Sequence, residues 1–149
     1  MNLTEALHGV ATALTGDSTI DSICQDTWGR SLTVYRRVGE LYVPQVEETP
    51  LVQMMSRGRA RDGHHVHHSV TIASFAGQNA EPQRDSQVVY SSDEEASERL
   101  AERVEEVAMQ SFATQGVAAE ASKEAEDIIT GPYFIAAYTF QIVLRNVIK

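Results

Sequence analysis

The chain has 149 residues, 42% hydrophobic and 22% charged, a composition typical of one folded domain and not of a disordered chain. The formal net charge is -9, and the acidic excess lies between Glu81 and Asp127, where thirteen acidic residues stand against four basic ones, which disfavours general nucleic-acid binding. The single cysteine, Cys24, excludes an intramolecular disulfide, and the lack of a signal-peptide pattern favours a soluble protein of a reducing compartment.

Two short helices are predicted within residues 2–29. Apolar residues recur at helical spacing from the third residue onward, after a capping pattern that begins at Asn2, and Gly16 ends this helix. A second helix follows a cap at Asp17 or Ser18, with its apolar residues on one face. We expect the two helices to form a hairpin.

Residues 32–76 are predicted to form strands. Leu32–Val38 is rich in β-branched and aromatic residues, and Leu51–Met55 is a second apolar run. The segment 57–63 contains two glycines and three arginines, which favours a flexible, turn-prone link. Residues 64–76 alternate in polarity, so they are interpreted as the second arm of a long hairpin.

The C-terminal half is predicted to contain a polar exposed loop at 77–87, a capped amphipathic helix at 92–115 and a long strand at 134–147. Residues 117–130 are rich in alanine and acids, which leaves a short helix and a loop both open. These elements predict one α+β domain over residues 1–149. We expect a two-layer sandwich of a mostly antiparallel sheet packed by an amphipathic helix, with an N-terminal helical segment.

Four of the five histidines fall within residues 64–68 and invite a metal-site hypothesis. On a strand, His65 and His67 point the same way about 7 Å apart, but two ligands are too few for a structural zinc site. Cys24 or a distant carboxylate would have to complete the set. The simpler interpretation is a polar strand face, which in an oligomer can line a subunit contact; no metal or other cofactor is expected.

Three arginines at alternate positions, Arg57, Arg59 and Arg61, can bind phosphate or the carboxylates of a partner protein. A solvated hairpin tip is an equally good interpretation. Because no aromatic residues are interleaved with them, direct nucleic-acid recognition is the weaker alternative. We therefore treat these arginines, with His65 and His67, as candidate interface residues.

Enzymatic activity has no sequence motif in its favour. The chain lacks a phosphate-binding glycine loop, a nucleophile elbow and a two-histidine zinc-protease motif. The carboxylates of the helix at 92–115 are better explained as its solvated face than as an acid-base pair. We therefore expect that the protein is not an enzyme.

Two passages carry a resemblance to a known family. One is Trp28-Gly-Arg-Ser-Leu-Thr-Val-Tyr35 followed by Thr49-Pro-Leu-Val52, and the other is the helix from Ser92 leading to Tyr138-Thr-Phe-Gln-Ile-Val-Leu144. In pattern and order these resemble the tail terminator, or tail completion, proteins of long-tailed bacteriophages, which cap the tail tube and join it to the head.

The resemblance implies a structural protein of the virion neck, assembled in the host cytoplasm as a ring, commonly a hexamer. Its partners would be further copies of itself, the tail tube protein and the head connector proteins, with no membrane. Genome DNA would pass through the ring without specific binding, because acids that face the channel repel it. The acids proposed for that lining are Glu94, Glu98, Glu102, Glu105, Glu120 and Glu124.

Two alternatives stay open at this point. The first is a head-side connector or stopper protein, which differs from a terminator only in its partner. The second is a small metal- or ligand-binding module of ferredoxin-like type, supported by the histidines alone.

Overall fold

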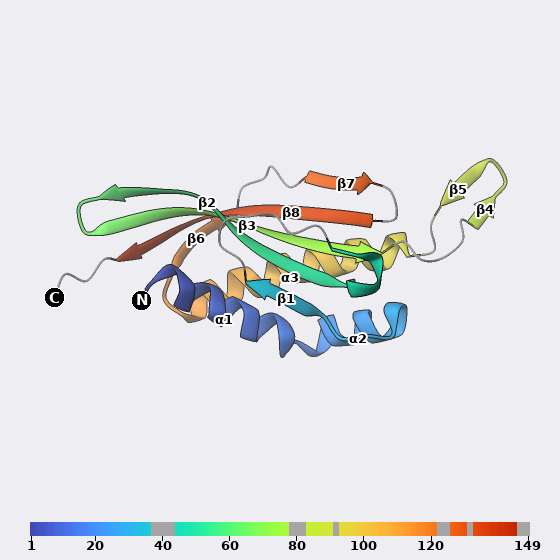
Figure 1. The fold of residues 1–149 in the computed structure, drawn as a ribbon, viewed down its shortest axis with the longest axis horizontal. Helices are drawn as coiled ribbons and strands as arrows, with labels where there is room; N and C mark the ends of the chain where they lie inside the picture. The colour runs from blue at the N-terminus through green and yellow to red at the C-terminus, as the bar shows by residue number, and fades with distance from the viewer. Residues whose placement is uncertain (37–43, 78–82, 91–92, 122–125, 131–132, 146–149) are drawn as a thin grey trace.

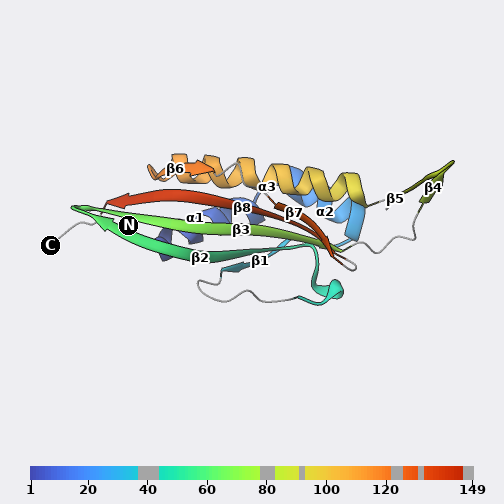
Figure 2. The same ribbon diagram turned by 90° about the horizontal axis from the view of Figure 1, so that it is seen from above.

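The structure is a computed structural model that describes residues 1–36, 44–77, 83–90, 93–121, 126–130 and 133–145 (Figure 1). The α+β class predicted from the sequence is confirmed, because helices cover one face of a mostly antiparallel sheet (Figure 2). The sheet is open, and a second, two-stranded sheet stands apart from it.

The two N-terminal helices begin and end where the sequence predicts. Helix α1 spans Leu3–Thr15, and Oδ1 of Asn2 accepts a hydrogen bond from the Glu5 N–H at 2.8 Å. Helix α2 spans Ser18–Trp28, and the carboxylate of Asp17 accepts from a first-turn N–H at 3.0 Å. Each cap satisfies a donor that has no partner inside the helix, so the helix starts at a defined residue.

The predicted hairpin of α1 and α2 is wrong. The two helices follow one another along α3 (Glu94–Thr114), with α1 beside its C-terminal half and α2 beside its N-terminal half (Figure 1). The carboxylate of Asp17, between the two short helices, binds Arg103 from the middle of α3 at 2.7 Å. A long amphipathic helix offers both short helices an apolar face, which a hairpin between them alone would not.

Helix α3 confirms the predicted helix at 92–115 to within two residues. Its N-cap is Asp93, whose backbone C=O accepts from the N–H of Ser97 at 2.9 Å and from its hydroxyl at 2.8 Å. Ser92, the predicted cap, lies outside the described residues. Acidic residues fill the first turn, where they oppose the positive end of the helix dipole.

Six strands form the main sheet in the order β1-β2-β3-β8-β6, and β7 also pairs with β8. Among the described pairs only β1 and β2 are parallel. The segment left open between a helix and a loop therefore forms strands β6 and β7, and the last two residues of the predicted C-terminal strand lie outside the described residues. The bounds are β1 (Thr33–Arg36), β2 (Leu51–Asp62), β3 (His65–Gly77), β6 (Ala118–Ala121), β7 (Glu126–Thr130) and β8 (Tyr133–Arg145).

The link predicted at residues 57–63 is also wrong. Strand β2 continues to Asp62, and only Gly63 and His64 make the turn into β3. Gly63 has a φ of 57°, a conformation that glycine adopts without a steric penalty. Cross-strand pairing with β3 keeps the arginine segment extended despite its low strand propensity.

The main core lies between the helices and one face of the sheet. On β8 alternate residues from Phe134 to Leu144 point into it, as the sequence pattern predicts. Phe112 of α3 meets Phe140 of β8 with ring centroids 5.8 Å apart and the planes tilted by 57°. On the opposite face a smaller core gathers Leu51, Ala73 and Phe75.

Residues 44–50, which include the 3-10 helix η1 (Val46–Glu48), lie against that opposite face. The Tyr133 hydroxyl donates to the Pro44 carbonyl at 2.7 Å and fastens the segment to β8. At the end of α2 the indole N–H of Trp28 donates to the Gly77 carbonyl at 2.9 Å, which fastens the helix layer to the end of β3.

Candidate assembly surfaces

The hairpin tip, defined here as residues 57–67 of β2 and β3, extends beyond the helix layer at one end of the molecule (Figure 1, Figure 2). The side chains of its first six residues are exposed. Strand β2 pairs with β3 along one edge. Along its other edge, only Leu51–Met54 has a partner strand among the described residues, namely β1. Within the described parts of the chain, the outer edge of β2 at the tip therefore leaves backbone N–H and C=O groups without a strand partner, and such groups can pair with another chain.

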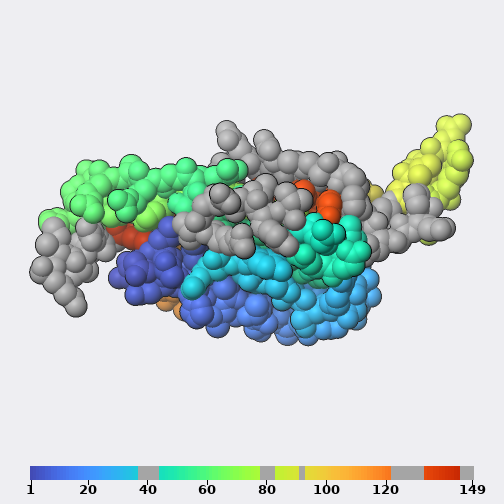
Figure 3. All heavy atoms as spheres, in the orientation of Figure 1, coloured from blue at the N-terminus to red at the C-terminus, as the bar shows by residue number. Residues whose placement is uncertain are grey.

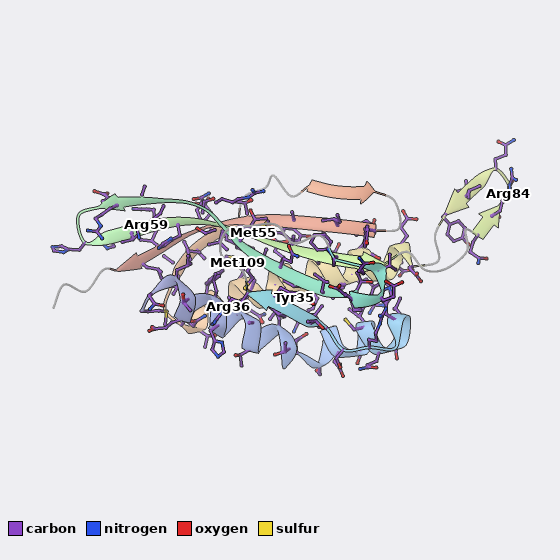
Figure 4. All side chains as sticks on the ribbon, viewed as in Figure 1. Tyr35, Arg36, Met55, Arg59, Arg84 and Met109 are labelled. Carbon is purple, nitrogen blue, oxygen red and sulfur yellow. The ribbon has the colours of Figure 1, made fainter. Side chains whose placement is uncertain are left out.

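The three arginines of the tip do not share one surface. The register between β2 and β3 shifts between Ser56 and Gly58, so Arg57 is an extra residue in a β-bulge. Its Nε donates to the Thr71 hydroxyl at 3.3 Å, on the face away from the helices. Arg59 and Arg61 pair with residues on the helix side of the sheet, and Figure 4 shows Arg59 on the projecting hairpin.

His68 is buried beside Arg59, unlike its exposed neighbours His65 and His67. It is 8% exposed, and its Nδ1 has no hydrogen-bond partner among the described residues. Burial, and then the positive charge of Arg59, lower the pKa of His68 below its ordinary value. Both effects favour the neutral form of the imidazole.

His65 and His67 are exposed and lie on the face of β3 away from the helices, as the alternation predicts. Within the described residues no three His, Cys, Asp or Glu side chains are grouped to hold a metal ion. Cys24, considered as a completing ligand, is buried in α2 at the other end of the molecule (Figure 1). Burial, and then the charge of Asp21, raise the pKa of the Cys24 thiol to about 12.

A second projection, which we call the arm, stands at the end of the molecule opposite the tip (Figure 1, Figure 3). It is a hairpin of β4 (Gln83–Asp85), which lies in the segment predicted to be a polar loop, and β5 (Val88–Tyr90), which follows that segment. Val88, Val89 and Tyr90 are 62%, 59% and 42% exposed. An isolated two-stranded hairpin is marginally stable in water, and exposed apolar side chains are typical of contact surfaces, so the arm is a candidate assembly surface.

The predicted channel acids fall on two elements. Glu94, Glu98 and Glu102 are exposed on one side of α3, and Glu105 beside them is half-buried. Glu120 is exposed on β6, at a position of the strand that faces away from the helices. The six acids therefore do not share one surface, and Glu124 lies outside the described residues.

A hollow of about 430 Å³ opens between α1 and α3. Its wall includes Gly9, Val107 and Gln115, and its one ionisable residue, Asp17, is already bound by Arg103. The side-chain amide of Gln115 donates to the Ala6 carbonyl and to the Ser111 hydroxyl, both at 3.1 Å. The lining offers no nucleophile with an adjacent base, so it has no arrangement for acid-base or covalent catalysis.

Asp17 connects two helices, because its carboxylate caps α2 and also binds Arg103 of α3. Arg103 binds it twice, through Nη2 at 2.7 Å and through Nε at 3.0 Å, and a third Arg103 nitrogen binds Glu106 at 2.9 Å. The hydrogen bond from Arg103 holds the pKa of Asp17 below its usual value. The sequence identified Asp17 as a cap but not this pairing, because the two residues are 86 positions apart.

The arm was missed because β5 is only three residues long. Its signal was present in the sequence as three consecutive strand-favouring residues after a polar turn.

None of the helices in the described part of the chain combines the length and apolarity needed to cross a bilayer. No protein-family model matches the sequence, and no curated protein is significantly similar to it.

Proposed function

We propose that this protein is a structural subunit that assembles with further copies of itself into a closed ring, of the kind that terminates the tail tube in the neck of a long-tailed bacteriophage. The observation that carries the proposal is the pair of unlike projections, the tip and the arm, at opposite ends of one subunit (Figure 3). Two different surfaces on one subunit favour head-to-tail contacts, which close into a ring when the rotation between subunits allows it.

The charges of α3 are consistent with a ring around DNA. Exposed carboxylates of α3 outside the subunit contacts, such as Glu102, repel phosphates where they face a channel, so DNA passes without adhering. In this proposal the tail tube protein and the head connector proteins are the other partners. A head-side connector or stopper has the same construction, and only the identity of the adjoining ring separates it from a terminator.

The experiment is absolute mass by light scattering over a concentration series, with negative-stain images of the same samples. We expect rings with a central hole, and a mass that is an integer multiple of 16.4 kDa. A mass of one subunit at every concentration contradicts self-assembly. Tight binding of the assembled ring to duplex DNA at low salt contradicts the repulsive channel.

A further inference from the structure

We propose that the subunit contact joins the tip of one copy to the arm end of a second copy, where the arm end comprises the arm and the first turns of α3 (residues 83–90 and 93–98). This inference rests on the ring assembly proposed above and names its interface. The two surfaces lie at opposite ends of the molecule, and Figure 4 shows Arg59 and Arg84 at those ends.

The first argument is charge complementarity. Residues 57–67 contain three arginines and one carboxylate, whereas residues 83–98 contain five carboxylates and one arginine. The structure shows no ion pair at Arg59, Arg61, Glu94 or Glu98 within the described residues, and all four side chains are exposed. Opposite charges without partners at the two ends favour head-to-tail over head-to-head contacts, because like ends repel.

The second argument is the backbone. The outer edge of β2 at the tip has no partner strand among the described residues, and the arm is a hairpin whose two strands pair only with each other. An arm strand laid along β2 would extend the sheet of the second copy by main-chain hydrogen bonds. This contact removes two exposed strand edges, which otherwise favour uncontrolled association.

The third argument is apolar surface. Val88, Val89 and Tyr90 are the exposed large hydrophobic residues of the described chain, apart from the N-terminal Met1. Because side chains alternate along a strand, Val88 and Tyr90 point to one side of the arm and Val89 to the other. If the arm strand pairs edge to edge with β2, each of these side chains lies beside cross-strand neighbours of the partner on its own face of the sheet.

The test reverses the charges at each end separately. In the tip variant, Arg59 and Arg61 are both changed to Glu; in the helix variant, the exposed Glu94, Glu95 and Glu98 are all changed to Arg, which gives the arm end a net positive charge. Each variant alone has like charges on both contacting ends, so we expect single-subunit mass under conditions in which the unmodified protein forms rings. A variant with Gln110→Arg and Thr114→Arg, two exposed positions in the other half of α3, is the control and should assemble normally.

Mixing the two reversed variants gives the decisive measurement. In an equimolar mixture every tip can meet an arm end of opposite charge if the two variants alternate around the ring. We therefore expect the mixture to recover the mass of the unmodified assembly, with both chains present in equal amounts. Recovery also shows that both variants are folded, and circular dichroism of each variant alone checks this independently.

The outcomes separate this interface from ring formation itself. Rings formed by either reversed variant alone, or a mixture that stays dissociated although both variants are folded, overturn the tip-to-arm contact and leave the proposed ring intact. An unmodified protein that stays at single-subunit mass at every concentration overturns the ring, and with it the interface.

Discussion

Changing Gly9 to Ala tests how α1 is joined to the end of α3. A Cβ at Gly9 would lie 2.4 Å from Nε2 and 2.6 Å from Oε1 of Gln115, so the amide has to leave its place. That amide makes two hydrogen bonds, to the Ala6 carbonyl and the Ser111 hydroxyl, each with a net value of about 1 kcal/mol. Alanine in the middle of a helix is favoured over glycine by about 1 kcal/mol.

The two effects oppose one another, and a double-mutant cycle separates them. We expect Gly9→Ala alone to lower the free energy of unfolding by about 1 kcal/mol, because the lost hydrogen bonds outweigh the gain in helix propensity. In a Gln115→Ala background the clash is absent, so Gly9→Ala should instead raise the free energy of unfolding by about 1 kcal/mol. The coupling between the two sites is then about 2 kcal/mol.

Urea unfolding followed by circular dichroism measures all four proteins of the cycle. The m-value should stay constant, so that shifts of the midpoint report stability alone. A Gly9→Ala cost that is the same in both backgrounds refutes the reasoning, because the obstacle would then not be the Gln115 side chain.

Three further predictions concern other contacts. His68→Leu should remove a loss of folding stability on acidification. The folded-state pKa of His68 lies below its ordinary 6.5, so on acidification the unfolded chain binds a proton that the folded chain rejects. The contribution of neutral His68 to the free energy of unfolding is therefore complete above pH 6.5 and falls below it. Urea midpoints at about pH 7.5 and pH 5 measure this, and an equal pH dependence in both proteins contradicts it. Asp17→Asn keeps an acceptor for the α2 cap and Asp17→Ala does not, so thermal unfolding should show the alanine variant less stable by about 1 kcal/mol; equal stability would show that the cap contributes nothing. Phe112→Ala, which empties a core site against Phe140, should cost about 3–5 kcal/mol in urea unfolding, and a cost under about 1 kcal/mol would mean that the core is not packed as described.

The candidate surfaces were only in part predictable from the sequence. Alternation placed His65 and His67 on one exposed face, because side-chain direction on a strand follows position alone. The same rule would place Arg57 with Arg59 and Arg61, but the bulge after Ser56 moves it to the opposite face. A bulge depends on the register of two strands, which no single segment encodes.

The sequence by itself determined the local elements. The caps at Asn2 and Asp17, the apolar face of α3 and the alternation along β8 each depend on residues a few positions apart, and hydrogen bonding and periodicity within one segment are enough to define them.

The tertiary structure alone decided how these elements meet. The long helix α3 draws α1 and α2 along its length in place of a hairpin, and Arg103 reaches Asp17 across 86 positions of sequence. Pairing with β3 turns the arginine segment into a strand, although its glycines and charges favour a turn. Contacts between distant segments outweigh local propensities of a few tenths of a kcal/mol per residue. The extended hairpin at residues 57–67 therefore could not be predicted from the sequence of that segment alone.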